Sequence, residues 1–405
     1  MFWLAWAAMA AISPLQYGYA ALLAKEPNGL TLLAAWIACQ AAGALPALHL
    51  VRRGRLGVRA CLAAGAALSG LGLTTAALTG PALPLALVGY ALLGGLGAGL
   101  VYGVCGEVVS SWYPERPAAR VGLITGAFGY GAVPLLLWAG IAPGSTSTAF
   151  LVAAVLAVAV IAAAARYLRL PPALWWPGDV DPRSHALDAA RLRTTPDAAK
   201  QFLLGQALRT RTLPALALIL TCAGAVSVFD VIVVAGTGSW GALAVLVALN
   251  GASRSVAMRA SEVFGRRRVL AAVLAALAIG QVLLATAVQN GAATAGLPGA
   301  TGTSLTDAAG PLLWLGAIAA GLGGGAFYPL VASLVREFFG TERHGEIHAV
   351  VYSAKALAGV AAVALALLAL SAPATGLLAA AALAALPALA TPRLRIPGLP
   401  ATIPL

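Results

Sequence analysis

Two positively charged side chains fall in stretches of the chain that are otherwise apolar. Arg254 lies within residues 242–257, and Lys355 interrupts the apolar run 347–370. A cation at the centre of a lipid bilayer costs about 2.5–3.5 kcal/mol on insertion scales. A chain that keeps two such cations needs a reason for both. They predict a site for a small anion, with a planar fork of donors at Arg254 and a point charge at Lys355.

The composition places these cations in a membrane protein. Of 405 residues, 61% are hydrophobic and 9% are charged, whereas a soluble domain carries about a quarter charged residues. About twenty apolar residues are needed to cross a bilayer, and runs of this length form helices. We therefore expect an all-α membrane protein with twelve transmembrane helices, in two pseudo-symmetric six-helix bundles. The expected spans are roughly 1–24, 29–50, 60–80, 83–111, 119–141, 146–168, 213–236, 239–259, 268–290, 309–336, 347–370 and 374–391.

The distribution of positive charge predicts the orientation of these spans. The formal net charge is +12, but all except three of the 25 Lys and Arg residues lie in segments that can share one side of the membrane. This is the positive-inside bias, so we expect a multi-pass protein of the plasma (inner) membrane with both termini cytoplasmic. A nucleic-acid partner is not expected, whereas membrane lipid is. The short basic links include Arg52, Arg53, Arg55 and Arg59, and the outer links hold Lys25, Glu26 and Asp307.

An internal repeat divides the spans into two halves. Residues 95–102 (GLGAGLVY) recur as residues 321–328 (GLGGGAFY), and each copy is followed by a Glu-Arg pair. Parallel halves of this kind are typical of secondary transporters, which hold substrate near the membrane midplane. The predicted organisation is an N-terminal bundle (1–168), a cytoplasmic linker (169–212), a C-terminal bundle (213–391) and a cytoplasmic tail (392–405). Within the linker, 197–208 is expected to form a surface helix, and 291–306 reads as a flexible outer loop.

Helix rise gives the depth of the charged residues. Arg254 and Lys355 both lie ~12–14 Å from the cytoplasmic side, close to the middle of the bilayer. Two buried acids, Glu107 and Asp230, are the alternative partners for these cations. Their depths of ~10 Å and ~25 Å differ from that of the cations. Either acid could instead act as a proton relay or gate.

Polar and aromatic residues also interrupt the spans. They could form a cage around a small anion, or they could serve packing and interface anchoring. Tyr352 lies one turn before Lys355, so these two share a helix face. The candidate cage residues are Gln16, Tyr17, Tyr102, Tyr130, Tyr328 and Tyr352.

Two further patterns concern movement of the helices. Glycines spaced by three and four residues, as at Gly122, Gly126 and Gly129, let helices approach closely. The loop after the eighth span combines an acid with an Arg cluster: Glu262, Arg266 and Arg267 are expected to pair across helix ends and brace one conformation.

These features resemble the major facilitator superfamily, and within it the oxalate/formate antiporter family. The superfamily loop is matched at Ser261-Glu262 and Gly265–Arg268. The narrower family is suggested by residues 97–102 leading into 111–116, by 250–254, and by 338–341 leading to 352–355. The resemblance implies a substrate cavity between two six-helix bundles, with Arg254 and Lys355 as carboxylate ligands. Gln16 and Tyr17 match cavity residues of the family's first helix. Tyr328 and Tyr352 match its aromatic cage positions, and Tyr130 matches one less closely.

The sequence therefore predicts a secondary transporter that exchanges small carboxylates, such as oxalate and formate, by alternating access. The alternative within the same fold is proton-coupled organic-anion uptake or drug efflux. A membrane enzyme is not expected because the four histidines are scattered, and a non-transporting sensor would normally carry an added soluble domain. We expect no cofactor and no metal, and a protein that acts as a monomer. The cysteines, Cys39, Cys61, Cys105 and Cys222, read as small buried apolar residues.

Overall fold

A computed structural model describes residues 1–26, 28–46, 50–51, 54–79, 83–172, 175–184, 198–289 and 310–398. The regular structure of these residues is helical throughout, with no strand among them. Ten helical segments are long and apolar enough to cross a membrane. The protein is thus an all-α, multi-pass membrane protein. The ten segments are α4 (Val58–Thr79), α5–η3–α6 (Leu83–Ala86, Leu87–Gly94 and Gly95–Trp112), α7–α8 (Pro117–Tyr130 and Val133–Ile141), η4–α9 (Pro143–Ser145 and Thr146–Tyr167), α12 (Thr212–Gly236), α13 (Trp240–Phe264), α14 (Arg266–Gln289), α15 (Pro311–Phe339), α16–α17 (His344–Ser353 and Lys355–Ser371) and α18–η6 (Pro373–Ala390 and Thr391–Arg393).

The first two expected spans are present in a different form. The first is divided into α1 (Phe2–Ala11), a π-helical turn η1 (Pro14–Gly18) and α2 (Tyr19–Leu22). The second is α3 (Gly29–Pro46), which is apolar but shorter than the others. The count of twelve is consistent with this arrangement. The ten longer segments begin and end within a few residues of the expected bounds.

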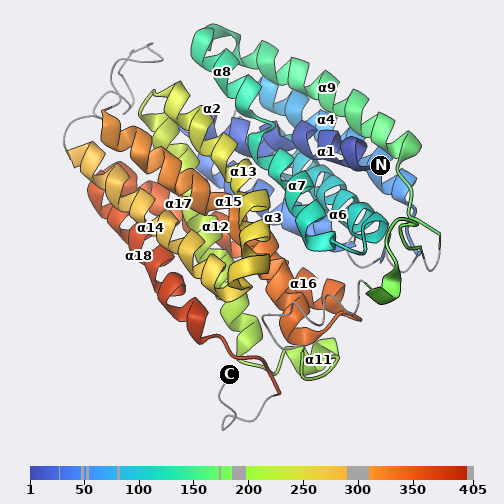
Figure 1. Cartoon of the computed structure of the whole chain (residues 1–405). Coiled ribbons are helices and arrows are strands. Elements are labelled where there is room, and N and C mark those ends of the chain that lie inside the picture. Colours follow the sequence, from blue (N-terminus) through green and yellow to red (C-terminus); the bar gives the residue numbers. More distant parts are fainter. Residues whose placement is uncertain are drawn as a thin grey trace.

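The helices of each half pack mainly against one another. In the first half α3 and α4 pack on α6, and α4 packs on α9. In the second half α13 and α14 pack on α15, and α12 packs on α17. The two halves meet where α7 contacts α13 and where α3 contacts α17. Figure 1 shows the blue-to-green first half beside the yellow-to-red second half, with α3, α7, α13, α15 and α17 near the centre.

Glycines bring α7 and α13 together at the boundary between the halves. A Cβ atom added at Gly129 would lie 2.5 Å from the Cα atom of Gly251, a separation that real Cβ atoms do not show. One added at Gly126 would lie 2.7 Å from the carbonyl oxygen of Gly251. The two backbones can approach this closely only because none of the three residues has a side chain.

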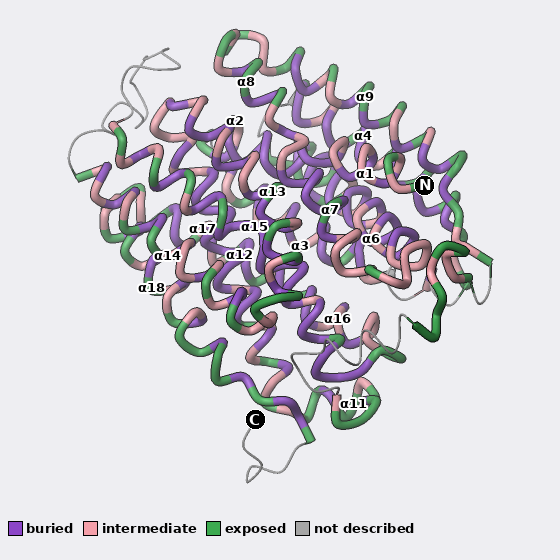
Figure 2. Tube along the Cα trace, viewed as in Figure 1, coloured by how far each residue is buried: buried purple, intermediate pink, exposed green. Residues whose placement is uncertain are grey.

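The outer faces of the helices are apolar, as expected for a protein that contacts lipid. Leu357, Val360 and Leu367 of α17 are exposed, as are Val155 and Leu156 of α9. Figure 2 shows the buried positions along the interior of the bundle and the exposed ones on its outer faces and ends. In a membrane this exposed apolar surface contacts lipid tails instead of water, so it does not need to be covered by further protein.

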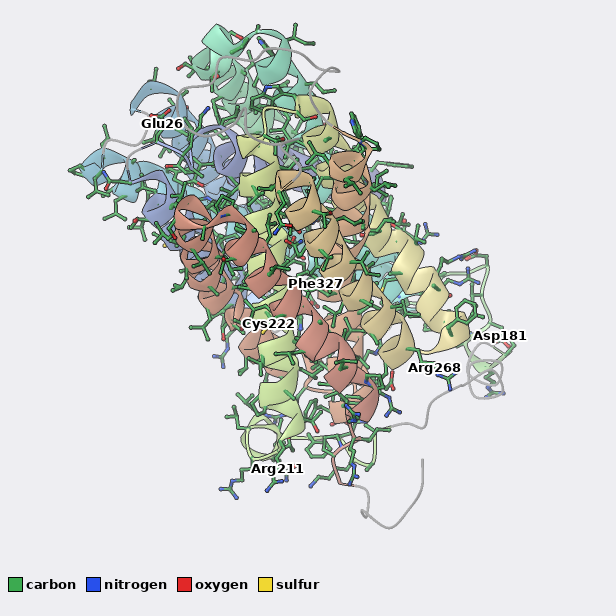
Figure 3. All side chains as sticks on the ribbon, turned by 90° about the vertical axis from the view of Figure 1, so that its left-hand side faces the viewer. Glu26, Asp181, Arg211, Cys222, Arg268 and Phe327 are labelled. Carbon is green, nitrogen blue, oxygen red and sulfur yellow. The ribbon has the colours of Figure 1, made fainter. Side chains whose placement is uncertain are left out.

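Positive side chains mark one end of the helices. Figure 3 places Arg211 and Arg268 at the lower end of the molecule and Glu26 at the upper end. We call the end that carries Arg211 and Arg268 the basic end. Arg254 lies ten residues before the end of α13 at Phe264, so it is ~15 Å from the basic end and within the membrane.

The linker is less regular than expected. Among its described residues, 182–184 are helical, and α11 (Leu204–Ala207) is one short α-helix that is followed by turns. The expected helix over 197–208 is therefore wrong in length, and Asp197 lies outside the described residues. Asp181 accepts hydrogen bonds from the backbone N–H groups of Ser184 (3.0 Å) and Arg183 (3.2 Å), which lower the pKa of its carboxyl below the ordinary value. The segment 291–306, Arg52, Arg53, Asp307, His49 and His185 also lie outside the described residues.

Candidate functional site

Arg254 is buried at the contact between the two halves. It belongs to α13 and is 1% exposed. Its Nη2 atom donates to Asn250 Oδ1 (3.2 Å), one helical turn earlier, and to the hydroxyl of Tyr17 (3.4 Å), which comes from η1 of the other half. Its Nε atom has no hydrogen-bond partner among the described residues. The guanidinium therefore meets only neutral groups and keeps an unused donor.

Lys355 is buried in the same way. It opens α17 and is 2% exposed. Its Nζ atom donates to Gln40 Oε1 of α3 (2.8 Å) and to Gln16 Oε1 of η1 (3.1 Å). Both contacts cross from the second half to the first. The ammonium group, like the guanidinium, is held by neutral oxygens.

Aromatic rings enclose both cations. The Tyr328 ring is shared, because its centroid lies 5.4 Å from Arg254 Cζ and 5.6 Å from Lys355 Nζ. Phe128 and Tyr352 lie 5.4 and 5.9 Å from Lys355 Nζ. Electrostatic attraction to the ring faces offsets part of the cost of burying the two charges.

Tyr102 completes the enclosure on the side of the first half. Its ring stacks on Tyr352 at 5.7 Å and meets Phe128 edge-on at 5.7 Å. Tyr102 and Tyr328 close the two copies of the internal repeat, in α6 and α15 respectively. The Tyr352 ring lies between them, 6.5 Å from Tyr328. The repeat thus places one tyrosine from each half in the group of buried side chains around Arg254 and Lys355, which we call the cluster.

Local breaks in the helices position several of these side chains. Gln16 and Tyr17 lie on the π-helical turn η1, which begins at Pro14. A π-helical turn is a local departure from the α-helix that is often found at functional sites. Lys355 follows a second break at Ala354, whose carbonyl accepts a hydrogen bond from Thr221 of α12 (3.3 Å).

Neither cation has an acidic partner among the described residues. The ion pairs there are Arg266–Glu337 and Arg343–Glu346, both at the basic end. The alternative that Arg254 and Lys355 pair with Glu107 or Asp230 is thus not found. A buried cation without a countercharge is costly, and an anion bound between the two would compensate both.

The two candidate acids lie away from the cations. Glu107 is buried in α6, where the hydroxyl of Ser111 donates to its Oε1 (3.5 Å). Asp230 of α12 is 1% exposed and accepts a hydrogen bond from Gln281 of α14 (2.5 Å).

One predicted cage residue lies elsewhere. Tyr130 accepts a hydrogen bond from Trp6 Nε1 (2.8 Å) at the end of α7. It lines a surface pocket of about 570 Å³ together with Phe2, Trp6 and Tyr113. The structure therefore does not bring Tyr130 together with Arg254 and Lys355. The other five predicted cage residues, Gln16, Tyr17, Tyr102, Tyr328 and Tyr352, all lie in the cluster.

The predicted bracing loop uses a different acid. Glu262 is exposed, whereas Arg266 pairs with Glu337 of α15 at 2.7 Å. Arg267 donates to the backbone carbonyl of Leu394 (2.8 Å), which ties α14 to the segment after α18. Gly265 supplies the turn between α13 and α14 with φ of 85°, a conformation that glycine adopts without strain. The expected pairing across helix ends is present, but Glu337 takes the place of Glu262.

Replacing Arg266 by Gln is expected to destabilise the protein more than replacing the exposed Arg268 by Gln. The Arg266→Gln change leaves the carboxylate of Glu337, whose side chain is 3% exposed, without its cation. An unsatisfied buried polar group costs about 1–3 kcal/mol. Thermal unfolding of the purified variants measures the difference, and equal midpoints would contradict a bracing role for this pair.

Four polar or aromatic members of the cluster were not predicted from the sequence. They are Gln40, Asn250, Phe128 and Ser227. Gln40 is fully buried and also donates to the Tyr352 hydroxyl (3.2 Å). Asn250 accepts from Tyr17 (3.1 Å) and donates to Ser227 (3.0 Å). For Gln40 and Asn250 the available signal was an amide inside an apolar span, the same criterion that selected Gln16.

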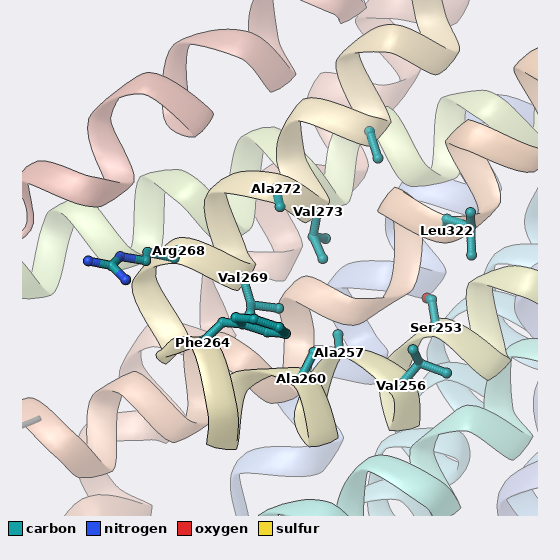
Figure 4. A pocket seen from close by; sticks show the side chains of 11 residues that line it. Ser253, Val256, Ala257, Ala260, Phe264, Arg268, Val269, Ala272, Val273 and Leu322 are labelled. Carbon is teal, nitrogen blue, oxygen red and sulfur yellow. The ribbon is translucent and has the colours of Figure 1, made fainter. Parts of the chain in front are cut away.

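A groove on the surface of the second half is separate from this cluster. It has a volume of about 520 Å³ and lies between α13 and α14, with Leu322 of α15 at its edge. Its lining is mostly Ala and Val, and Figure 4 shows the Arg268 side chain directed away from the other labelled residues. Apart from Ser253 and Arg268, this lining offers no polar side chain to an anion. Among the described residues, no group of three His, Cys, Asp or Glu side chains is placed to hold a metal ion.

The fold is shared with known transporters. A POT family transporter in complex with 5-aminolevulinic acid matches over 97% of this chain and 96% of its own, with a TM-score of 0.68 and 13% sequence identity. The proton:xylose symporter XylE of the major facilitator superfamily matches over 96% and 95%, with a TM-score of 0.64 and 14% identity. A variant of the nucleoside transporter NupG matches over 97% and 100%, with a TM-score of 0.62 and 13% identity.

The chain therefore has the major facilitator fold. No protein-family model matches it, and no curated protein does. At 13–14% identity the likeness to the solved structures establishes the fold alone. The resemblance to the oxalate/formate antiporters accordingly stays a hypothesis.

Proposed function

We propose that this protein is a secondary transporter that exchanges small carboxylate anions, of the oxalate or formate kind, by alternating access. The observation that carries the proposal is the pair Arg254 and Lys355. Both are buried at the contact between the halves, both face the Tyr328 ring, and both are held only by neutral oxygens.

A carboxylate fits these two cations chemically. Its oxygens can replace Gln16 Oε1 and Gln40 Oε1 on Lys355, and the Tyr17 hydroxyl on Arg254. Hydrogen bonds between two charged groups are roughly twice as strong as those between neutral groups. The surrounding rings leave few other polar groups for a ligand, which favours a small anion with one or two carboxylates.

The contacts of the cations suit alternating access. Lys355 is tied to Gln16 and Gln40, and Arg254 to Tyr17, so each cation joins one half to the other. An anion that takes over these cations weakens contacts between the halves and gives the two halves a shared ligand. Substrate binding is thereby linked to the relative movement of the bundles.

Charge also favours exchange over one-way transport. Without an anion, the closed site holds two uncompensated cations in surroundings of low dielectric. With an anion bound, that cost is reduced. The conformational change is then faster with substrate bound in both directions, which is the kinetic property of an exchanger.

The proposed orientation places the basic end in the cytoplasm of a plasma (inner) membrane. Met1 and Phe2 line a pocket with Tyr113 and Arg120, and Leu394 contacts Arg267. The first residues of the chain and the segment after α18 thus lie beside basic residues, which supports cytoplasmic termini under the positive-inside bias. We propose that the protein works as a monomer surrounded by lipid.

A ligand screen tests the proposal. Purified protein is heated with oxalate, formate, succinate, lactate or chloride, and any anion that raises the unfolding midpoint is then used for counterflow into preloaded proteoliposomes. We expect at least one carboxylate, and not chloride, to do both. No carboxylate response in either assay would overturn the proposal. Flux that follows a pH gradient without any need for counter-substrate would instead support the alternative of proton-coupled uptake or efflux.

A further inference from the structure

A buried acid and a buried amide face one another outside the anion site. Asp230 of α12 is 1% exposed and Gln281 of α14 is fully buried. Gln281 Nε2 donates to Asp230 Oδ1 (2.5 Å). The two remaining oxygens, Asp230 Oδ2 and Gln281 Oε1, have no hydrogen-bond partner among the described residues. By helix rise Asp230 lies ~9 Å from the end of α12 opposite the basic end, and so within the membrane.

A single proton on Asp230 would satisfy both oxygens. An ionised carboxylate only accepts hydrogen bonds, and the amide oxygen of Gln281 also only accepts. The pair as ionised therefore leaves two buried acceptors and one buried negative charge uncompensated, which is costly in a membrane. A protonated Oδ2 is a donor, and the unpartnered amide oxygen of Gln281 is an acceptor that it could use. The result would be a cyclic acid–amide pair with two hydrogen bonds.

Among the described residues, no cation is placed to compensate the charge of an ionised Asp230. The helices packed against α12 are α2, α13, α14, α15, α16, α17 and α18. Their charged groups all lie nearer the basic end than Asp230. Arg254 follows Asn250, the partner of Ser227 one turn below Asp230, and Lys355 follows Ala354, which contacts Thr221, nine residues (~14 Å) below it. The remaining charged groups of α13 to α16 lie still closer to the basic end, and α18 has none. α2 contributes Tyr19, which stacks on Tyr90, and the nearest tyrosine of α15, Tyr328, lies beside Gly224.

We infer that Asp230 and Gln281 form a proton-binding site, and that Asp230 carries a proton in this conformation. Asp230 gains the proton from water when the site opens to one side of the membrane. It returns the proton to water when the site opens to the other side. The O–H bond of Oδ2 breaks in that step and the carboxylate is left solvated.

The proton site is connected to the anion site by hydrogen bonds. Asp230 lies one helical turn from Ser227, whose hydroxyl accepts a hydrogen bond from Asn250 Nδ2. Asn250 Oδ1 accepts in turn from Arg254 and from Tyr17. A carboxylate that draws Arg254 away from Asn250 therefore alters the contact of α12 with α13 next to Asp230. Through this connection the carrier would move a proton with its anion. This coupling rests on the proposed function, whereas the protonation of Asp230 does not.

The test of protonation needs no substrate. Infrared difference spectra compare wild type with Asp230→Asn in lipid at neutral pH. We expect a carboxylic-acid carbonyl band in wild type that Asp230→Asn removes and that Asp181→Asn, an exposed control in the linker, keeps. Identical spectra for wild type and Asp230→Asn would overturn the inference.

The pH dependence of thermal unfolding is a second test of whether Asp230 is protonated. The folded wild type holds a proton that the unfolded carboxyl has released at neutral pH, so the stability of the fold decreases as pH rises. Asp230→Asn has no proton to lose and should show a smaller decrease. An equal decrease in both would count against the proton site. Should Asp230→Asn not fold, Gln281→Leu replaces it, with the acid band shifted by the loss of its hydrogen-bond partner as the supporting result and an unmoved spectrum as the opposing one.

Transport measurements distinguish the coupling of proton to anion from the proposed function of carboxylate exchange. With a carboxylate identified by the ligand screen, an acid gradient across the proteoliposome membrane should change wild-type uptake several-fold and leave Asp230→Asn uptake unchanged. Asp230→Asn should still exchange substrate, because it mimics the protonated acid. An acid band with no counterflow of any carboxylate would uphold the proton site and reject the proposed function. Counterflow with equal gradient dependence in both proteins would reject the coupling and keep the function.

Discussion

Replacing Lys355 or Arg254 by Gln is expected to abolish carboxylate exchange in proteoliposomes. Each cation is buried at the contact between the halves and would meet the anion without water between them. Removing one partner of a buried charged pair costs about 2–5 kcal/mol, which corresponds to a loss of affinity of at least about 30-fold. The measurement is counterflow of preloaded substrate at a fixed external concentration.

The same variants should be more stable than wild type without substrate. Each Gln removes a buried cation that has no acidic partner in the described part of the chain, and the cost of keeping that charge from water disappears with it. The unfolding midpoint should therefore rise while the increase caused by carboxylate is lost. This opposite change separates loss of the ligand from failure to fold.

Matched controls come from exposed cations. Arg259 lies on α13 as Arg254 does but is exposed, and Lys25 is exposed at the end opposite the basic end. Arg259→Gln and Lys25→Gln should exchange substrate at nearly the wild-type rate. Wild-type exchange by Lys355→Gln or Arg254→Gln would remove the basis of the proposed function.

The second large effect is expected at the contact of α7 with α13. A Cβ atom at residue 129 would fall 2.5 Å from Gly251 Cα and 2.6 Å from Gly251 N, and backbone atoms cannot move aside as a flexible side chain can. Overpacking usually costs about 1–3 kcal/mol, and a clash with backbone belongs at the upper end of this range. We expect Gly129→Ala to lower the unfolding midpoint clearly and to slow exchange, since the halves can no longer meet here.

Gly106 provides the control for this change. It lies within α6, as Gly129 lies within α7, but a Cβ atom added there meets no atom within 4 Å. Gly106→Ala should be neutral or slightly stabilising, because alanine favours the helix by about 1 kcal/mol over glycine. Equal effects of the two substitutions would show that the α7–α13 contact has no special need for glycine.

Much of the cluster could be anticipated because polar residues are rare inside apolar spans. Gln16, Tyr17, Tyr102, Tyr328 and Tyr352 were selected by that rarity and by the internal repeat, and the structure gathers them around the two cations. Tyr130 met the same criterion but lies beside Trp6. Sequence position gives the depth of a side chain but not the direction in which it leaves the helix axis.

The partners of the charged residues could not be anticipated for the same reason. Glu262 and Glu337 both lie near the basic end, and only the packing of α14 on α15 brings Glu337 to Arg266. Gln281 was not singled out at all, although it provides the hydrogen bond to Asp230. In each case the partner comes from a helix that is distant in the sequence.

The sequence by itself determined that the chain crosses the membrane repeatedly, that it has two related halves, and that Arg254 and Lys355 lie near the midplane. These properties depend on apolar length and on the fixed rise of a helix, which are local. Only the tertiary structure decided that both cations face Tyr328, that Gln40 and Asn250 join them, and that Asp230 meets Gln281. Those contacts depend on how each helix is rotated against its neighbours, which packing between distant segments decides.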